Sequence, residues 1–321
     1  MSKNTFCTII TKSHLSWALA LNDSVKQFDE NIKMYILVTD VHYLESNYLI
    51  KFPNTNILYL KDIENIKYGK EIIEKYAEQP DFMRWALKPT LISYLITQKF
   101  EKIIYCDCDI YFYDGYNFLW EELDKNNVLL TPHWISHQNL INIGSIHSAG
   151  LFNAGFIGVS KPGYDVMDWW AKACLYKCVH SVDYLNGDQG YLDLFPVYFD
   201  NIKILTHKGC NVAYWNSDYL KRLIENGNFS LEFEKHKYPL IFYHFGRNSY
   251  SQFLKSSEEA FIGILEILNS TLKKYGFTKD LLELAQKQLE QQNCEINKPL
   301  NRVRSFFGKK IRYRIYKMNN D

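Results

Sequence analysis

Short apolar runs alternate with amphipathic stretches along the first half of the chain. Residues 6–10, 34–38, 57–60 and 102–106 have the length and apolar content of buried strands. Residues 13–28 and 82–97 carry apolar side chains at helical spacing, and Asp81 is placed to cap the second of these helices. Strands that alternate with helices predict an α/β fold with a mostly parallel sheet flanked by helices.

The second half of the chain continues this alternation less regularly. Residues 131–150 have the composition of a surface loop, residues 151–160 read as a glycine-containing strand, and residues 165–178 read as a helix. Another helix is expected to begin at Asp188, and two more are expected over residues 257–275 and 279–291. We therefore expect one large domain over residues 1–255 and a helical C-terminal appendage over residues 256–321.

Polar residues follow the predicted strands at the point where each strand ends. Thr11, Asp40 and the triplet Asp107-Cys108-Asp109 fall at such ends, where open α/β sheets bind their ligands. Carboxylates at i and i+2 lie on the same side of an extended backbone, so Asp107 and Asp109 can face one ion. Mg²⁺ and Mn²⁺ commonly join one or two protein carboxylates to substrate phosphates. The alternative interpretation is an acidic turn after a strand.

Composition limits the classes of protein to which the chain can belong. Its 321 residues are 47% apolar and 16% aromatic, and 37 basic and 36 acidic residues give a formal net charge of +1. This charge provides no overall field that would recruit nucleic acid. The seven cysteines are scattered and odd in number, which favours reduced thiols in a cytoplasmic setting. The sequence has no signal-peptide pattern and no apolar run long enough to cross a bilayer.

Residues 301–318 differ from the rest of the chain. They contain seven Lys and Arg residues interleaved with apolar and aromatic side chains, and no acidic residue. Such a stretch can lie on an anionic membrane surface, so we expect the protein to be peripheral to the inner membrane. A solvated charged tail is the alternative, and RNA binding has no motif in its favour.

Five short motifs occur in an order and spacing that resemble a known family. The chain resembles the retaining nucleotide-sugar glycosyltransferases of the GT-A fold, and among them the family-eight enzymes, which include bacterial lipooligosaccharide galactosyltransferases and glycogenin. The resemblance extends over most of residues 5–250. The motifs are Arg84…Lys88, Asp107-Cys108-Asp109, Asn153-Ala154-Gly155, Gly187-Asp188-Gln189 and His244-Phe245-Gly246.

The resemblance implies a role for each matching residue. Asp107, Asp109 and His244 would hold Mn²⁺ (or Mg²⁺), which acts as a Lewis acid on a departing nucleoside diphosphate. Asp188 and Gln189 would be the catalytic residues beside the donor sugar. The other residues implied in donor binding are Thr8, Thr11, Asp40, Arg84, Lys88, Asp107, Cys108, Asn153, Ala154 and Arg247.

Structural roles remain open for several of these residues. Arg84 and Lys88 can instead belong to a solvated helix surface, His244 can sit at the edge of the core, and Asp188 can simply cap a helix. After His244 the family carries a longer pattern that ends in a lysine. This chain has Arg247 there instead, so no lysine can be assigned to the leaving group.

These features predict a transferase that moves a sugar from a nucleotide-sugar, UDP-linked, to a cell-surface glycan or a lipid-linked acceptor. The resemblance implies retention of configuration. Because a neutral amide such as Gln189 is a poor nucleophile, front-face displacement is favoured over a glycosyl-enzyme intermediate. The alternatives are an inverting GT-A transferase with Asp188 as its base, and a catalytically weak protein that binds sugar nucleotides. A nucleotidyltransferase is disfavoured because residues 8–16 lack the glycines of a phosphate loop.

Overall fold

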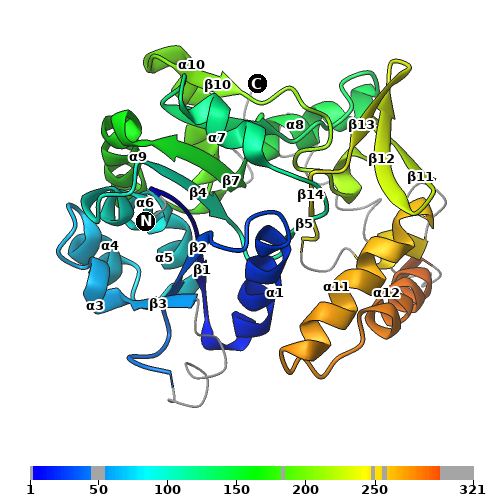
Figure 1. The fold of residues 1–321 in the computed structure, drawn as a ribbon, viewed down its shortest axis with the longest axis horizontal. Coiled ribbons are helices and arrows are strands. Elements are labelled where there is room, and N and C mark those ends of the chain that lie inside the picture. The colour runs from blue at the N-terminus through cyan, green and yellow to red at the C-terminus, as the bar shows by residue number, and fades with distance from the viewer. Residues whose placement is uncertain (1–2, 45–54, 182–184, 247–249, 255–258, 297–321) are drawn as a thin grey trace, which may run out of the picture.

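A seven-stranded sheet forms the centre of the molecule (Figure 1). The computed structural model describes residues 3–44, 55–181, 185–246, 250–254 and 259–296. The strand order is β10-β6-β7-β4-β1-β2-β3, and β7 runs antiparallel to both of its neighbours while the other pairs are parallel. The predicted mostly parallel α/β sheet is therefore confirmed. Its strands are β1 (Asn4–Ile10), β2 (Lys33–Val38), β3 (Thr55–Tyr59), β4 (Lys102–Cys106), β6 (Val128–Pro132), β7 (Phe152–Ser160) and β10 (Ile202–Ile204).

Helices cover both faces of this sheet, because successive strand residues point to opposite faces and both sets are apolar. On one face Cys7 and Ile9 pack with α6 and α9, and on the other Phe6 and Ile10 pack with α1 and α7. The helices are α1 (Leu15–Lys26), α3 (Leu60–Ile63), α4 (Gly69–Lys75), α5 (Pro80–Ala86), α6 (Lys88–Thr97), α7 (Asn117–Leu123), α8 (Ile143–Ala149), α9 (Tyr164–Tyr176), α10 (Phe195–Tyr198), α11 (Ile262–Lys274) and α12 (Leu281–Ile296).

Three small sheets and several 3₁₀ turns complete the described part of the chain. The small sheets pair β5 (Ile110–Phe112) with β14 (Phe242–His244), β8 (His180–Ser181) with β9 (Leu185–Asn186), and β11 (Lys221–Glu225) with β12 (Asn228–Phe233) and β13 (His236–Pro239). The 3₁₀ turns are η1 (Lys12–His14), η2 (Leu140–Asn142), η3 (Lys161–Gly163), η4 (Gln189–Leu194), η5 (Tyr214–Asn216), η6 (Tyr250–Leu254) and η7 (Glu259–Phe261).

A third apolar core joins the C-terminal helices to the rest of the fold. Trp17 and Ala20 of α1 share this core with Leu268 of α11 and Leu281 of α12. Figure 1 shows α11 and α12, in orange, beside α1. None of the described helices is both long and apolar enough to cross a membrane. The division of the chain at residue 255 remains a prediction.

Three local expectations from the sequence are wrong. The helix expected over residues 82–97 is two helices, because α5 ends at Ala86 and α6 begins at Lys88, with Pro89 in its first turn. Asp81 does not cap α5, since the helix starts one residue earlier with Pro80, a residue well suited to a first helical position. Residues 131–150 are not all loop, because they include the end of β6, the turn η2 and the helix α8.

Candidate functional site

Two carboxylates and an imidazole meet at the carboxyl end of β4. Asp107 and Asp109 lie in the turn that joins β4 to β5, and β5 pairs antiparallel with β14 so that His244 lies opposite Ile110. This register places the ring next to the turn. The ligand atoms of Asp107, Asp109 and His244 lie within 4.8 Å of one another, and Nε2 of His244 is 3.3 Å from Oδ1 of Asp109.

Gly155 of β7 allows these groups to approach one another. The N–H of Asp107 donates to the carbonyl of Gly155 at 2.7 Å, which fixes the turn against β7. A Cβ at position 155 would lie 2.5 Å from Cε1 of His244, 2.6 Å from Oδ1 of Asn153 and 3.0 Å from Oδ2 of Asp107. No larger residue fits there without displacing the surrounding side chains, so this glycine is part of the site.

The chemistry of this cluster fits a divalent cation. Two carboxylates and one imidazole form a ligand set that suits Mn²⁺ or another first-row ion. Nδ1 of His244 is buried and makes no hydrogen bond within the described part of the chain. Burial alone lowers the pKa of His244, but Asp109 and then Asp107 outweigh it and raise the pKa above its usual value. The environment therefore favours a positive charge at this point, which a bound cation would supply.

Lys88 connects the carboxylates to a second acidic residue. Its buried ammonium lies 3.3 Å from Oδ1 of Asp107 and 3.2 Å from Oδ2 of Asp188, and it donates to the carbonyl of Ala154 at 3.1 Å. Burial alone lowers the pKa of Lys88, but the charges of Asp107 and Asp188 outweigh it and raise the pKa. The hydroxyl of Tyr105 also donates to Asp107, at 2.7 Å. Lys88 is therefore a charged group inside the site and not part of a solvated helix face.

Asp188 is held inside the protein by this pairing. It immediately precedes η4, but its side chain makes no capping hydrogen bond, so the capping interpretation is wrong. Burial raises the pKa of Asp188 to about 6, while the charge of Lys88 partly offsets this rise. Gly187, with φ of +58°, forms the preceding turn, and its missing Cβ leaves room for Trp85. A buried carboxylate next to a cation can accept hydrogen bonds from ligand hydroxyls.

Asn153 and Gln189 complete the arrangement through backbone and imidazole contacts. The amide nitrogen of Asn153 donates to Nε2 of His133 at 3.2 Å, and its oxygen accepts from the N–H of Gly155 at 2.7 Å. Gln189 accepts from the N–H of Ala154 at 3.0 Å and donates to the carbonyl of Ala149 at 2.7 Å. Both side-chain amides thus have fixed orientations at the edge of the site.

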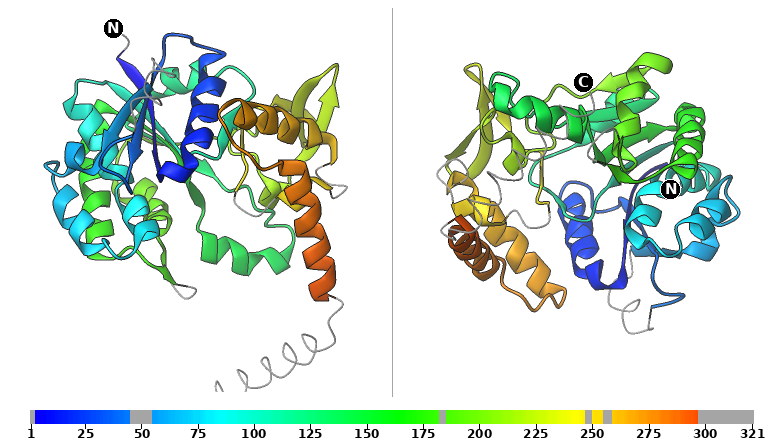
Figure 2. Two further views of the ribbon diagram at one scale, coloured as in Figure 1. Left: turned by 90° about the horizontal axis from the view of Figure 1, so that it is seen from below. Right: turned by 180° about the vertical axis from the view of Figure 1, so that it is seen from behind.

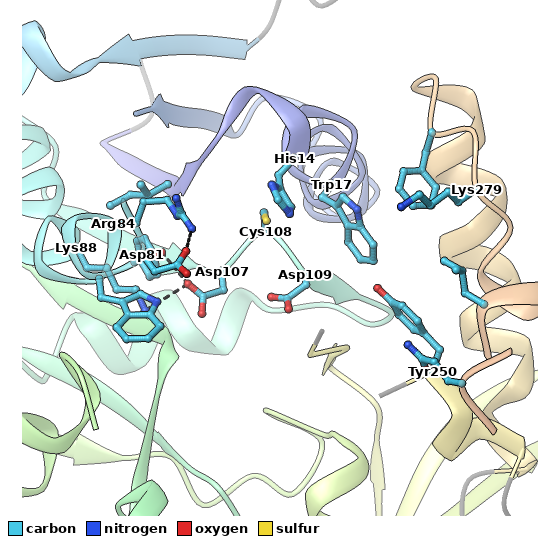
Figure 3. Close-up of a pocket in the computed structure, with 16 residues that line it drawn as sticks. His14, Trp17, Asp81, Arg84, Lys88, Asp107, Cys108, Asp109, Tyr250 and Lys279 are labelled. Carbon is cyan, nitrogen blue, oxygen red and sulfur yellow. Dashed lines mark hydrogen bonds and ion pairs between the residues drawn. The ribbon is translucent and has the colours of Figure 1, made fainter. Parts of the chain in front are cut away.

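A cavity of about 450 Å³ opens over Lys88, Asp107 and Asp109 (Figure 3). One wall comes from α5, α6 and the Asp107–Asp109 turn, and carries Arg84, which is paired with Asp81. The other wall comes from α1, η6 and the C-terminal helices. Its residues are His14, Trp17, Tyr250, Phe277, Lys279, Leu284 and Gln288. The cavity therefore places cationic and acidic groups on one side and mostly aromatic and apolar groups on the other.

The structure does not bring every predicted residue to this cavity. Arg84, Lys88, Asp107, Cys108 and Asp109 line it. Asn153, Ala154, Asp188, Gln189 and His244 join them through the contacts described above. Thr8 is fully buried within β1 and is not among the lining residues. Thr11 contacts the cavity residue His14 at 2.8 Å, and Asp40 accepts from the N–H of Lys12 at 2.7 Å. Arg247 lies outside the described residues.

Sequence reasoning missed the second wall of the cavity. Trp17, Tyr250 and Lys279 belong to elements far apart in the chain, so no local motif marks them as neighbours. It also missed the β11–β12 hairpin, although the Asn226-Gly227 pair is a strong turn signal. Both residues have positive φ, of 52° and 81°, as a two-residue hairpin turn requires.

The chain is similar in sequence to two known proteins and similar in fold to a solved glycosyltransferase structure. No family model matches the chain. Two uncharacterized Bacillus subtilis proteins are similar in sequence: YfnF is 28% identical over 256 residues, which cover 75% of this chain and 80% of that protein, and YfnD is 24% identical over 253 residues, which cover 76% and 78%. The crystal structure of the galactosyltransferase LgtC, solved with donor and acceptor sugar analogues, superposes with a TM-score of 0.53 and 12% identity, covering 88% of this chain and 99% of that one.

This chain has the GT-A fold. Within the GT-A fold, its resemblance to the family-eight glycosyltransferases extends over the body of the molecule as well as the short motifs. The GT-A sheet explains why the Asp107–Asp109 turn faces a cavity, since ligands bind beyond the carboxyl ends of the parallel strands in open sheets of this kind.

Proposed function

We propose that the protein is a metal-dependent glycosyltransferase that moves a sugar from a UDP-sugar to a cell-surface glycan or a lipid-linked precursor, with retention of anomeric configuration. The observation that carries this proposal is a cavity lined by Asp107, Asp109 and Lys88, with His244 beside Asp109 and the buried Asp188 paired with Lys88. The basic-aromatic residues 301–318 motivate a location at the inner membrane surface.

The three clustered side chains would hold the metal ion, which when bound supplies Lewis-acid stabilisation of the leaving diphosphate. Lys88 pairs with Asp107 and with Asp188 and so fixes both carboxylates in place. Asp188 would accept hydrogen bonds from hydroxyls of the donor sugar. Oε1 of Gln189 already accepts one hydrogen bond and keeps a second acceptor position, which could face the developing positive charge at the anomeric carbon.

Transfer on this arrangement is a front-face exchange of two bonds. The bond from the anomeric carbon to the diphosphate oxygen breaks, and its electron pair goes to the nucleoside diphosphate. The acceptor oxygen bonds to the same carbon, and its proton goes to the leaving phosphate oxygen. Because this route needs no protein base, the pairing of Asp188 with Lys88 is compatible with it. An inverting reaction would instead require Asp188 to contact the acceptor hydroxyl.

The test is UDP release from a panel of UDP-sugars with and without Mn²⁺. We expect one donor to be hydrolysed in a metal-dependent way and Asp109→Asn to lower the rate at least about a hundredfold. The matched control is Asp124→Asn, which changes an exposed carboxylate on another element. Mn²⁺-dependent UDP binding without release from any donor would favour the binding-protein alternative. Absence of UDP binding would overturn the proposal.

A further inference from the structure

The segment around η2 and α8 exposes aliphatic side chains to an unusual degree. Leu140 is 79% exposed, Ile141 87%, Ile143 39% and Leu151 54%. We call these four residues the α8 surface. Single exposed aliphatic residues are common on proteins, but four within twelve consecutive positions form a local apolar patch. Such patches indicate a surface that contacts another protein or a membrane.

The α8 surface lies in an uncharged stretch of the chain. Residues 126–160 contain no Asp, Glu, Lys or Arg, although 23% of the whole chain is charged. The body of the protein is acidic: eight of the 37 basic residues and one of the 36 acidic residues fall within residues 297–321. That leaves 29 basic and 35 acidic residues, a net charge of −6, in residues 1–296. An anionic bilayer would repel such a body. The repulsion would be weakest at an uncharged apolar surface.

The helix α8 and the C-terminal end of α12 lie on the same side of the molecule. The left view of Figure 2 shows that both elements project from the same side of the molecule. The sequence after α12 contains eight basic residues and four aromatic residues, a composition suited to anionic headgroups. The apolar α8 surface is complementary to the acyl chains of a bilayer. The basic segment, which starts on the same side, is complementary to the anionic headgroups.

The α8 surface is also close to the candidate site. A mostly apolar cavity of about 300 Å³ lies between α8 and the sheet, and its lining includes Ile135, Ile146, Leu151 and His133. The imidazole of His133 bonds to Asn153 and to the carbonyl of Gly150. A bilayer that touches α8 would therefore lie next to the Asn153 side of the candidate site.

We propose that the α8 surface inserts into the interfacial layer of an anionic bilayer, and that this contact together with residues 297–321 directs the cavity toward lipid-linked acceptors. The acceptor part rests on the proposed transferase function, while the docking itself does not. The aliphatic side chains provide the part of the binding that salt does not weaken. The basic residues provide the salt-sensitive part.

The experiment is sedimentation of the full chain with vesicles of phosphatidylcholine and phosphatidylglycerol at low and high salt. We expect the double substitution Leu140→Ser, Ile141→Ser to lower the partition coefficient at least tenfold at high salt. The matched control is Val197→Ser, Tyr198→Ser on α10, whose side chains are 72% and 70% exposed and should not matter. All four side chains are largely in water, so neither variant should unfold, as melting temperatures would confirm.

Equal partition of the wild type and the η2 variant would overturn the proposal. So would a dimer in solution that the η2 substitutions dissociate while vesicle binding stays unchanged, since the surface would then join two copies of this chain. UDP release without vesicles separates the two proposals. If the wild type released UDP but did not bind vesicles, the docking proposal would be refuted and the transferase proposal would be supported. Vesicle binding without release from any donor, and without UDP binding, would refute the transferase alone.

Discussion

The absence of a side chain at Gly155 decides how closely the three candidate metal ligands can approach one another. The groups that a Cβ would meet belong to His244, Asn153 and Asp107, at 2.5 to 3.0 Å. The substitution Gly155→Ala should therefore push the imidazole away from the carboxylates. We expect the affinity for Mn²⁺, measured by calorimetry with UDP present, to fall at least about tenfold, because metal sites tolerate little change in ligand geometry.

Gly115→Ala is the control for this experiment. A Cβ at Gly115 would meet no atom within 4 Å, and Gly115 has no positive φ that would strain an alanine. Its metal affinity should equal that of the wild type. If Gly155→Ala also bound Mn²⁺ like the wild type, His244 could not be a ligand in the observed orientation.

His133 should make the stability of the fold depend on pH. Burial lowers its pKa to about 4, despite the hydrogen bond to Gly150 that favours the charged form. Below pH 6.5 the unfolded chain binds a proton at this histidine and the folded chain does not, so folding loses free energy as the pH falls toward 4. A shift from 6.5 to about 4 corresponds to about 3 kcal/mol.

Urea unfolding of the wild type and His133→Gln at neutral and acidic pH measures this effect. The variant should be less stable at pH 7, because it disturbs the contacts with Asn153 and Gly150. The difference between the two proteins should narrow by up to about 3 kcal/mol as the pH approaches 4. His147→Gln, at an exposed position of α8, is the control. If the difference in stability between the wild type and His133→Gln did not change with pH, the imidazole of His133 would have the same pKa in the folded and unfolded states.

At the scale of elements, the connection between α11 and α12 brings residues into the cavity. Phe277 and Lys279 lie in this connection and line the cavity. Lys279 lies across the cavity from Asp107 and Arg84 (Figure 3). Within α12, Gln288 accepts a hydrogen bond from the N–H of Ser251, which fastens η6 and places Tyr250 in the same cavity. The C-terminal helices thus shape the cleft in addition to covering α1.

Lys279 lines the cavity, and under the proposed function its ammonium would attract the diphosphate of the nucleotide. Lys279→Met should weaken UDP binding about fivefold, the effect of about 1 kcal/mol expected for a solvent-exposed charge pair. Binding of uridine, which has no phosphate, should not change. Lys287→Met on α12 removes an exposed cation that does not line the cavity, and should change neither affinity. A loss for uridine as large as that for UDP would instead indicate a change in cavity shape.

The elements also explain how far the sequence could predict the structure. Apolar runs locate β1, β2 and β4 because buried strands require them, and two spaced carboxylates after β4 indicate the turn that carries the candidate metal ligands. Burial of Lys88 could not be read from the chain, since lysine is almost always exposed unless it is paired. Its partner Asp188 is distant in sequence. The pairing of β5 with β14, which brings His244 to the turn, is likewise non-local, and the family resemblance supplied that residue instead.

At the scale of the whole molecule, charge is divided between an acidic body and a basic end. The full chain has a net charge of +1, while residues 1–296 alone have −6. Each basic residue near an anionic membrane surface contributes about 1 kcal/mol, and this attraction fades within a Debye length. Removal of residues 297–321 should therefore invert the sign of the electrostatic interaction and lower vesicle binding at low salt to the part that the α8 surface provides.

The same truncation should leave the chemistry in solution intact. The residues that surround the candidate site all precede residue 297, and the apolar core shared by α1, α11 and α12 is retained. UDP release from the preferred donor should stay within about twofold of the full chain, while transfer to an acceptor embedded in anionic vesicles should fall with the loss of binding. Equal transfer by both proteins would mean that the basic end does not bring the cavity to its acceptor. The acidic body would then reach the bilayer without electrostatic help, through the α8 surface alone.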